Sequence, residues 1–338
     1  MAEAKGTLKR DRFYTEEDAD LGLIKDLPIA VLGYGSQGHA QAQNMRDQGL
    51  DVIIGNVEDR FAEQARGDGF EVVPIPDAVQ RGRVILMLIP DEVQPAVFKT
   101  DIGPHLTPDH TLVFASGYAV HFGLITPPDF LDVILSVPTC VGAIVRERYA
   151  RGQGIFGHFG VYQDVTGQAH DLALAVSMGI GILRFGATET TFGDEVAVNL
   201  FAETAGLSGM IKYLLTAFEV LVEAGFSAEK AYGETFYEIQ FLTESICRMP
   251  FGQAVAFGSP TATYLALTKT GDVVTEDVRE RMRQMLARIK AGELVRDWNL
   301  EQLAGCPVLN QCRREILEHP ISEVEELFLE RKLASGGV

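Results

Sequence analysis

The sequence is poor in basic residues and in cysteine for its length of 338 residues. Lysine and arginine number 29 against 47 aspartates and glutamates, which gives a formal net charge of -18. So acidic a protein repels phosphate backbones and anionic lipid surfaces, and we therefore expect neither nucleic acid nor a membrane as its partner. A small molecule is the expected substrate.

Disulfide, signal-peptide and membrane-helix patterns are also missing. The four cysteines, Cys140, Cys247, Cys306 and Cys312, form no CxxC pair, and their wide spacing is typical of reduced thiols. Segment 1–26 is polar, without the apolar core of a signal peptide. No later run reaches the roughly 18 uninterrupted apolar residues of a membrane helix. These absences predict a cytoplasmic protein.

Two periodicities divide the chain. Up to about residue 187, short apolar runs alternate with helical patterns, which predicts an α/β fold with a doubly wound parallel sheet. The expected strands are 28–33, 51–55, 71–73, 83–90, 111–114 and 131–137, followed by a helix and strand within 169–187. From residue 188 onward only helical patterns remain, at 194–224, 227–249, from Thr275 onward and at 321–332. We therefore expect two domains, 1–187 and 188–338.

A glycine-rich loop follows the first predicted strand and opens a helix. It reads Gly33-Tyr34-Gly35-Ser36-Gln37-Gly38. The first glycine permits the tight turn, the second lets a pyrophosphate approach the backbone, and the third lets helix and strand pack closely. In this context the motif predicts a Rossmann domain that binds NADH or NADPH, and hence an oxidoreductase.

The end of the second predicted strand carries three charged residues, Glu58, Asp59 and Arg60. A carboxylate at this place accepts hydrogen bonds from the free 2′-hydroxyl of NADH, whereas a 2′-phosphate requires arginine or lysine. Glu58 and Asp59 therefore favour NADH, and Arg60 leaves NADPH open. The alternative is that all three are solvated loop charges.

Two predicted helices each carry a pair of polar groups one turn apart, Asn199 with Glu203 and Glu234 with Glu238. Residues four apart lie on one helical face, so each pair can point at a single metal or substrate. Solvated acidic residues are the alternative, although Glu203 lies in an otherwise apolar stretch. The seven histidines form no HExxH or similar metal-binding pattern.

At these motifs the chain resembles the short form of ketol-acid reductoisomerase, over nearly its whole length. The resembling stretches are Gly33–Ala40, Ile89–Glu92, Tyr162–Asp164, Glu189–Phe192, Leu200–Glu203 and Ser259–Ala262. The resemblance implies a Rossmann domain and an all-α, knotted C-terminal domain of the 6-phosphogluconate-dehydrogenase type. It also implies a homodimer or higher oligomer, with an active site that takes helices from both subunits.

In that family a hydroxy-keto acid is isomerised by alkyl migration on two Mg²⁺ ions and is then reduced by NADPH. The resemblance implies that the metal ligands are Glu203, Glu234 and Glu238. It further implies that Ser259 binds substrate and that Pro90 lies at the cofactor. Asn199 stands where the family has its first aspartate ligand.

Further departures fall at the same implied site. Thr139 replaces the catalytic lysine, Ser116 replaces a histidine, and the segment Val141-Gly142-Ala143 keeps only the glycine of the family pattern. A neutral amide at residue 199 removes a charge that helps to hold Mg²⁺, and losing the lysine removes a cation and a proton donor. Mg²⁺ is therefore a doubtful cofactor, and we expect impaired isomerisation with surviving hydride transfer.

Our main hypothesis is a metal-independent NAD(P)H reductase of a small amino or keto acid that acts on a C=N bond, as an imine reductase. One of the three glutamates, Glu203 by preference, would bind or protonate the nitrogen. Two alternatives stay open. One is a working ketol-acid reductoisomerase in which Asn199 still ligates Mg²⁺ through its carbonyl oxygen. The other is a catalytically dead paralogue that binds nucleotide as a sensor or structural partner.

Overall fold

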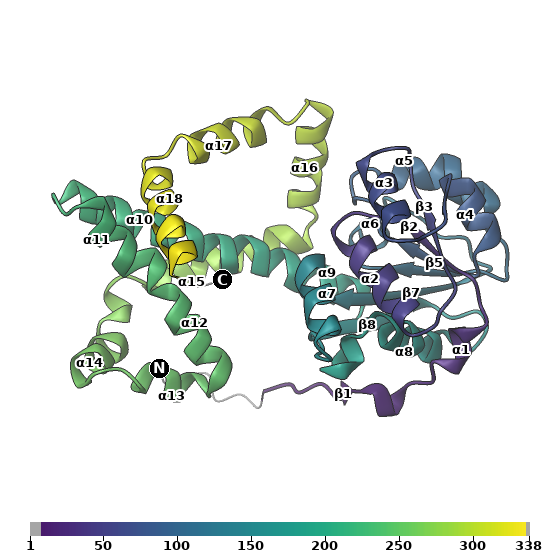
Figure 1. Cartoon of the computed structure of the whole chain (residues 1–338), viewed down its shortest axis with the longest axis horizontal. Coiled ribbons are helices and arrows are strands. Elements are labelled where there is room, and N and C mark those ends of the chain that lie inside the picture. Colours follow the sequence, from purple (N-terminus) through teal and green to yellow (C-terminus); the bar gives the residue numbers. More distant parts are fainter. Residues whose placement is uncertain (1–7, 336–338) are drawn as a thin grey trace. The chain divides into compact units, whose positions relative to one another are not determined.

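The structure is a computed structural model that describes residues 8–335 (Figure 1). It divides into two compact units, Met1–Val198 and Asn199–Val338, and each is described by itself below. The first seven residues of the polar segment 1–26 lie outside the described part.

The first unit is built on a nine-stranded sheet with the order β1-β9-β8-β7-β6-β5-β2-β3-β4. Strands β2 to β7 run parallel, which confirms the Rossmann-type sheet. The strands are β1 (Phe13–Tyr14), β2 (Ile29–Leu32), β3 (Val52–Gly55), β4 (Val72–Val73), β5 (Val84–Met87), β6 (Thr111–Phe114), β7 (Asp132–Pro138), β8 (Gly157–Gln163) and β9 (Ala187–Glu189).

Two strands were not expected from the sequence, and both introduce antiparallel pairs. β8 runs antiparallel to β7, and β1 runs antiparallel to β9. β8 contains Gly157 and Gly160, which weaken a strand pattern because glycine contributes no side chain to either face. β1 has only two residues, too few to show an alternation.

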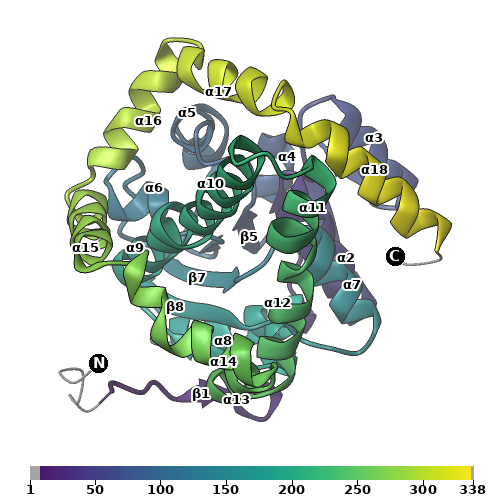
Figure 2. The same ribbon diagram turned by 90° about the vertical axis from the view of Figure 1, so that its left-hand side faces the viewer.

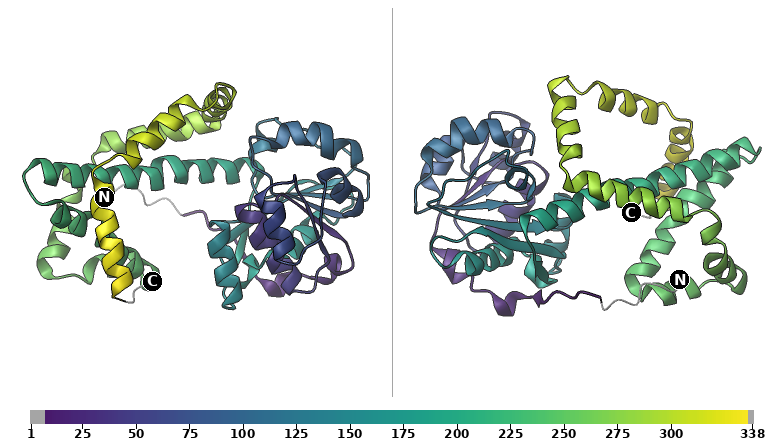
Figure 3. Two further views of the ribbon diagram at one scale, coloured as in Figure 1. Left: turned by 45° about the horizontal axis from the view of Figure 1, so that its top comes forward. Right: turned by 180° about the vertical axis from the view of Figure 1, so that it is seen from behind.

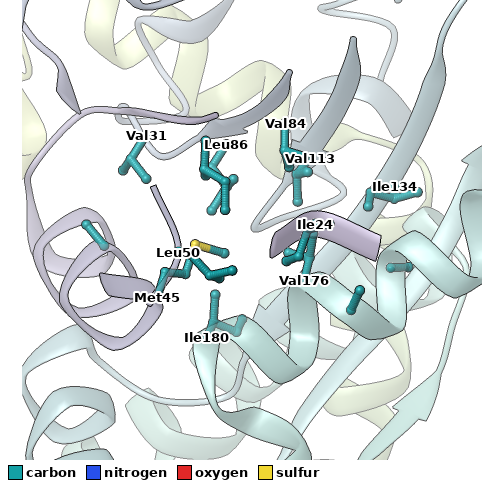
Figure 4. Close-up of a cluster of buried hydrophobic side chains, with 14 of the residues drawn as sticks. Ile24, Val31, Met45, Leu50, Val84, Leu86, Val113, Ile134, Val176 and Ile180 are labelled. Carbon is teal, nitrogen blue, oxygen red and sulfur yellow. The ribbon is translucent and has the colours of Figure 1, made fainter. Parts of the chain in front are cut away.

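Helices cover both faces of the sheet, and the strand residues alternate between two buried clusters. In β2, for example, Ile29 and Val31 join one cluster, whereas Ala30 and Leu32 join the other. All four are buried, as expected for a parallel strand covered on both sides. The first cluster also takes Ile24, Met45 and Val176 from three helices (Figure 4).

The helices of the first unit lie around this sheet, which Figure 3 shows from two sides. α2 and α7 lie side by side (Figure 2), and α8 also packs on α2. The helices are α1 (Gly22–Lys25), α2 (Ser36–Asp47), α3 (Arg60–Gly67), α4 (Ile75–Arg81), α5 (Gln94–Val97), α6 (Tyr118–His121), α7 (Gly142–Ala150), α8 (Ala169–Ile180) and α9 (Phe192–Phe201).

The second unit is helical throughout its described residues, as expected. The long helices predicted over 194–224 and 227–249 each contain a π-helical segment, Ala202–Ser208 and Gly233–Tyr237. The helices are α10 (Gly209–Glu223), α11 (Ala228–Tyr232), α12 (Ile239–Arg248), α13 (Phe251–Ala256), α14 (Pro260–Thr268), α15 (Glu276–Lys290), α16 (Glu293–Leu303), α17 (Pro307–Leu317) and α18 (Ile321–Ala334). Helices α13, α14, α16 and α17 were not predicted.

The second unit has a thin core of its own. One hydrophobic cluster among its described residues has three buried members, Phe218, Ala231 and Ile321. α17 has no buried residue, and α16 has one, Val295. The stretch Phe192–Glu223 is long and apolar enough to cross a membrane by length and composition, and its most apolar part is 6% buried within this chain.

Candidate active site

The glycine-rich loop joins β2 to α2 with the geometry that a dinucleotide requires. Gly33 has a φ of 96°, and a side chain there would lie 2.9 Å from the main-chain nitrogen of Ile89. A Cβ at Gly38 would lie 2.0 Å from the carbonyl oxygen of Gly33, so helix and turn can pack this closely only with glycine. Gly35 faces open space, with no heavy atom within 4 Å of an added Cβ. The loop thus leaves room for a pyrophosphate at the N-terminus of a 12-residue helix.

The side chains of the loop hold it in place. Tyr34 is buried, and its hydroxyl donates to Asp68 Oδ2 at 2.8 Å. Ser36 Oγ accepts from the N–H of Gly142 at 3.1 Å, and Gln37 Nε2 donates to the carbonyl oxygen of Cys140 at 2.7 Å. The loop that follows β7 therefore packs directly on the dinucleotide loop.

The three charged residues after β3 have different surroundings. Asp59 caps α3, because its Oδ1 accepts from the N–H groups of Phe61 and Ala62 at 2.9 and 3.0 Å. The guanidinium of Arg60 lies over the ring of Phe61, 4.7 Å from its centre. Glu58 is exposed and forms an ion pair with Arg66 of α3.

The loop after β5 is shaped by its own main chain. The carbonyl oxygen of Pro90 accepts from the N–H groups of Val93 and Gln94 at 3.0 and 3.2 Å. Gln94 is buried, and its Nε2 donates to the carbonyl oxygen of Ile89 at 2.9 Å and to Asp91 at 3.1 Å. Pro90 itself is exposed at the carboxyl edge of the sheet, where Rossmann domains bind ligands.

Thr139 and Ser116, which by the resemblance replace a lysine and a histidine, are engaged within the fold. Thr139 follows β7, and its hydroxyl donates to the carbonyl oxygen of Phe156 at 2.9 Å. Ser116 follows β6, and its Oγ accepts from the N–H of Tyr118 at 3.2 Å. Both hydroxyls therefore help to fix the loops in which they lie, and neither supplies a cation.

Glu195 is a site residue that the sequence reasoning missed. This glutamate of α9 is buried, and its Oε2 accepts from the N–H of Gly117 at 2.6 Å. Gly117 lies so close to Phe192 that a Cβ there would be 2.2 Å from the Phe192 carbonyl oxygen. The loop with Ser116 is thus held against the first turn of α9. The signal was present in the sequence, because Glu195 lies one turn before Asn199.

The predicted glutamates lie at the two π-helical segments. Glu203 lies within Ala202–Ser208, Glu234 lies within Gly233–Tyr237, and Glu238 follows directly. Such π-helical turns occur often at functional sites. All three are exposed, and no lysine or arginine within residues 8–335 forms an ion pair with them.

The single chain does not gather these glutamates into a metal site. Among the residues described, no group of three His, Cys, Asp or Glu side chains could hold a metal ion. Asn199 lies one turn before Glu203 and is exposed. Ser259 caps α14, where its Oγ accepts from the N–H of Ala262 at 3.2 Å.

Family comparisons cover both units. Residues 23–186 match the family described as acetohydroxy acid isomeroreductase, NADPH-binding domain. Residues 192–331 match the ketol-acid reductoisomerase C-terminal domain.

Individual proteins give the same result. The chain is 44% identical over 317 residues to the ketol-acid reductoisomerase (NADP(+)) of Methanopyrus kandleri, covering 93% of this chain and 96% of that protein. It is 44% identical over 302 residues to the enzyme of the same name from Petrotoga mobilis, covering 89% and 91%. A solved structure of an NADH-preferring ketol-acid reductoisomerase from an uncultured archaeon has a TM-score of 0.92 and 34% identity, covering 94% of this chain and 98% of that one.

The main hypothesis from the sequence, an imine reductase without the isomerase step, is wrong. The relatives at 44% identity over about nine-tenths of the chain are ketol-acid reductoisomerases. Three substituted positions, Ser116, Thr139 and Asn199, carried that hypothesis. Weighed against the similarity of both domains, they are changes within one family and do not indicate a different reaction.

Proposed function

The chain belongs to the ketol-acid reductoisomerase family, and on that premise we propose that it isomerises a small acetohydroxy acid and reduces the product with a nicotinamide nucleotide. The observation that carries the proposal is similarity to enzymes of that name along both domains. In this proposal residues 1–187 bind the nucleotide, and residues 188–338 hold the substrate and form the dimer. The open space at Gly35 supports binding of the pyrophosphate at this loop.

NADH is the proposed cofactor. The end of β3 carries two carboxylates, and the exposed one, Glu58, would repel a 2′-phosphate but accept hydrogen bonds from a free ribose hydroxyl. Relatives of both kinds exist, since the two similar enzymes above are named for NADP(+) and the solved structure prefers NADH. The local charge therefore supports NADH in this chain.

The residues present suit Mg²⁺ by their chemistry. This hard cation prefers carboxylate and carbonyl oxygens, which Glu203, Glu234 and Glu238 supply together with the amide oxygen of Asn199. When bound, Mg²⁺ polarises the substrate oxygens and the nucleotide supplies the hydride. One neutral ligand in place of a carboxylate should weaken the affinity for the ion without abolishing it.

The other site residues bind the substrate or hold the loops of the site in position. Ser259 accepts a hydrogen bond from the Ala262 N–H, so its own hydroxyl hydrogen stays free to donate to a substrate oxygen. Glu195 fixes the loop at Gly117 against the helix that carries Asn199. The Thr139 hydroxyl donates to the main chain and keeps that loop in register with β8.

A second copy of the chain is part of the proposal. The exposed apolar side chains of the second unit include Leu207, Ile211, Val220, Phe226 and Phe241. Pairing with another copy would cover them and would also bring a further set of glutamates to each site. Sedimentation should give a dimer or a multiple of it, and a monodisperse folded monomer would contradict this part. Free thiols at all four cysteines suit the proposed cytoplasmic location.

The test is turnover of acetolactate with Mg²⁺ and either NADH or NADPH, followed by identification of the product. Formation of dihydroxy-isovalerate with faster turnover on NADH supports the proposal. Nucleotide binding without consumption of any acetohydroxy acid would sink it and would favour a catalytically dead paralogue.

A further inference from the structure

The structure pairs Glu58 with an arginine that the sequence motif does not include. Arg66, in the last turn of α3, donates from Nη1 to Glu58 Oε2 at 2.9 Å and from Nη2 to Oε1 at 2.5 Å. Both side chains are accessible, with 75% of Glu58 and 44% of Arg66 exposed. The pair thus presents one carboxylate and one guanidinium at the carboxyl end of β3.

The neighbouring charges are committed elsewhere. Asp59 accepts from two main-chain N–H groups of α3, and its Oδ1 also accepts from Asn56 Nδ2 at 2.9 Å. Arg60 stacks on Phe61. Glu58 and Arg66 are an exposed pair after β3 that takes no part in the cap of α3 or in the stack on Phe61.

We infer that the Glu58–Arg66 ion pair sets the cofactor preference of this protein. Glu58 accepts the hydroxyls of the adenosine ribose of NADH, and Arg66 holds that carboxylate in place. This inference rests on the proposed use of a nicotinamide nucleotide and adds the residue that positions the selecting carboxylate. It also assigns Arg66 as the cation that binds a 2′-phosphate once Glu58 is neutralised.

The chemistry of the pair allows both roles. A carboxylate has about four lone-pair positions, so two bonds from Arg66 leave positions for ribose hydroxyls. The hydrogen bonds from Arg66 also hold the pKa of Glu58 below its ordinary value. The ionised carboxylate repels a 2′-phosphate, and it occupies the guanidinium that would otherwise bind one. The pair itself is a surface ion pair of small stabilising effect, so removing one partner frees the other without unfolding the domain.

The experiment measures the Kd of NADH and of NADPH by fluorescence titration, with no substrate present. We expect Glu58→Gln to weaken NADH and tighten NADPH, so that the ratio of the two Kd values shifts toward NADPH by about tenfold or more. In the double variant Glu58→Gln/Arg66→Gln the gain in NADPH affinity should disappear. An unchanged ratio in Glu58→Gln would overturn the inference.

Matched controls separate this pair from general charge effects. Glu71 and Arg81 form an equivalent ion pair with two contacts of 2.8 Å. Glu71 precedes β4, at the amino ends of the parallel strands, whereas Glu58 follows the carboxyl end of β3. Glu71→Gln should leave the ratio unchanged, and an equal shift there would contradict the inference. A second result would also contradict it. In that result the gain in NADPH affinity of Glu58→Gln persists in Glu58→Gln/Arg66→Gln but is lost in Glu58→Gln/Arg60→Gln.

The binding test is independent of turnover. If acetolactate is not consumed but the Kd ratio shifts as expected, the proposed reaction fails and the role of Glu58 and Arg66 stands. If acetolactate is consumed but the ratio stays constant, the inference fails and the proposed reaction stands.

Discussion

The main-chain N–H of Gly142 donates to Ser36 Oγ at 3.1 Å, and this bond joins the loop after β7 to the dinucleotide loop. The approach is so close that a Cβ on Gly142 would lie 1.5 Å from the Ser36 carbonyl oxygen. By the resemblance, Gly142 is also the one residue of its segment that keeps the family pattern, whereas Val141 and Ala143 depart from it. The contact leaves no room for a side chain at this position.

Gly142→Ala should therefore damage the nucleotide site. Backbone atoms cannot yield as a flexible side chain can, so both loops must shift, at a cost of about 1–3 kcal/mol or more in the free energy of unfolding. We expect a lower Tm and a Kd for NADH raised by about tenfold or more. Gly67→Ala is the control, because nothing lies within 4 Å of a Cβ there. Wild-type binding by Gly142→Ala would contradict the assigned contact.

Much of the first unit could be predicted because its signals are local. The strand β2, the glycine loop and α2 follow one another in the sequence, and each strand of the parallel sheet is a short apolar run. β8 escaped prediction because its glycines interrupt that pattern and its partner β7 lies about twenty residues earlier. Local patterns do not specify such long-range antiparallel pairing.

The site was predictable in its residues and less so in their roles. Asp59 is a predicted ribose ligand, and only the fold shows that its Oδ1 also caps α3. Arg66 escaped notice because its partner Glu58 is eight residues away, beyond the helical spacing that a sequence pattern uses. In the second unit many apolar side chains of the described residues are exposed, and apolar periodicity did not mark all the helices.

Tyr118→Phe should keep or raise stability. The Tyr118 hydroxyl is buried and has no hydrogen-bond partner among the described residues, and burial raises its pKa to about 12. Removing a buried group without a partner is neutral or stabilising, by roughly 1 kcal/mol. Tyr34→Phe is the matched control, because it removes a bond of 2.8 Å to Asp68 and should cost about 1–3 kcal/mol. Chemical unfolding measures both, and equal losses in the two variants would refute the assignment.

Stability should fall as the pH drops through the range in which histidine titrates, partly because of His158. Burial lowers the pKa of His158 below 6.5, and its Nδ1 lies 2.9 Å from the Thr188 hydroxyl. The unfolded chain therefore binds the proton more readily than the folded protein does. The stability that is present above the pKa of His158 in the unfolded chain is lost as the pH falls through its lower pKa in the folded protein. His158→Gln should flatten the fall of Tm between about pH 8 and about pH 5.

Burial lowers the pKa of His110 as well. His110→Gln should flatten the same curve, and the double variant His158→Gln/His110→Gln should flatten it further. A slope that is unchanged in His158→Gln would show that this ring does not titrate with unfolding.

Asn199→Asp tests the neutral position in the proposed metal site. Asn199 lies one turn before Glu203. A carboxylate at residue 199 would add a second negative charge on the same helix, at the proposed ion site. Mg²⁺ loses hydration when it binds, and an added negative charge offsets that loss better than an amide oxygen does. We expect the Kd for Mg²⁺, measured by calorimetry on the complete oligomer, to fall by about tenfold or more.

Asn310→Asp makes the same charge change at an exposed position of α17 and should leave the Kd for Mg²⁺ unchanged. Because both variants change the net charge equally, tighter binding in both would assign the effect to general electrostatics, whereas tighter binding in Asn199→Asp alone assigns it to the site.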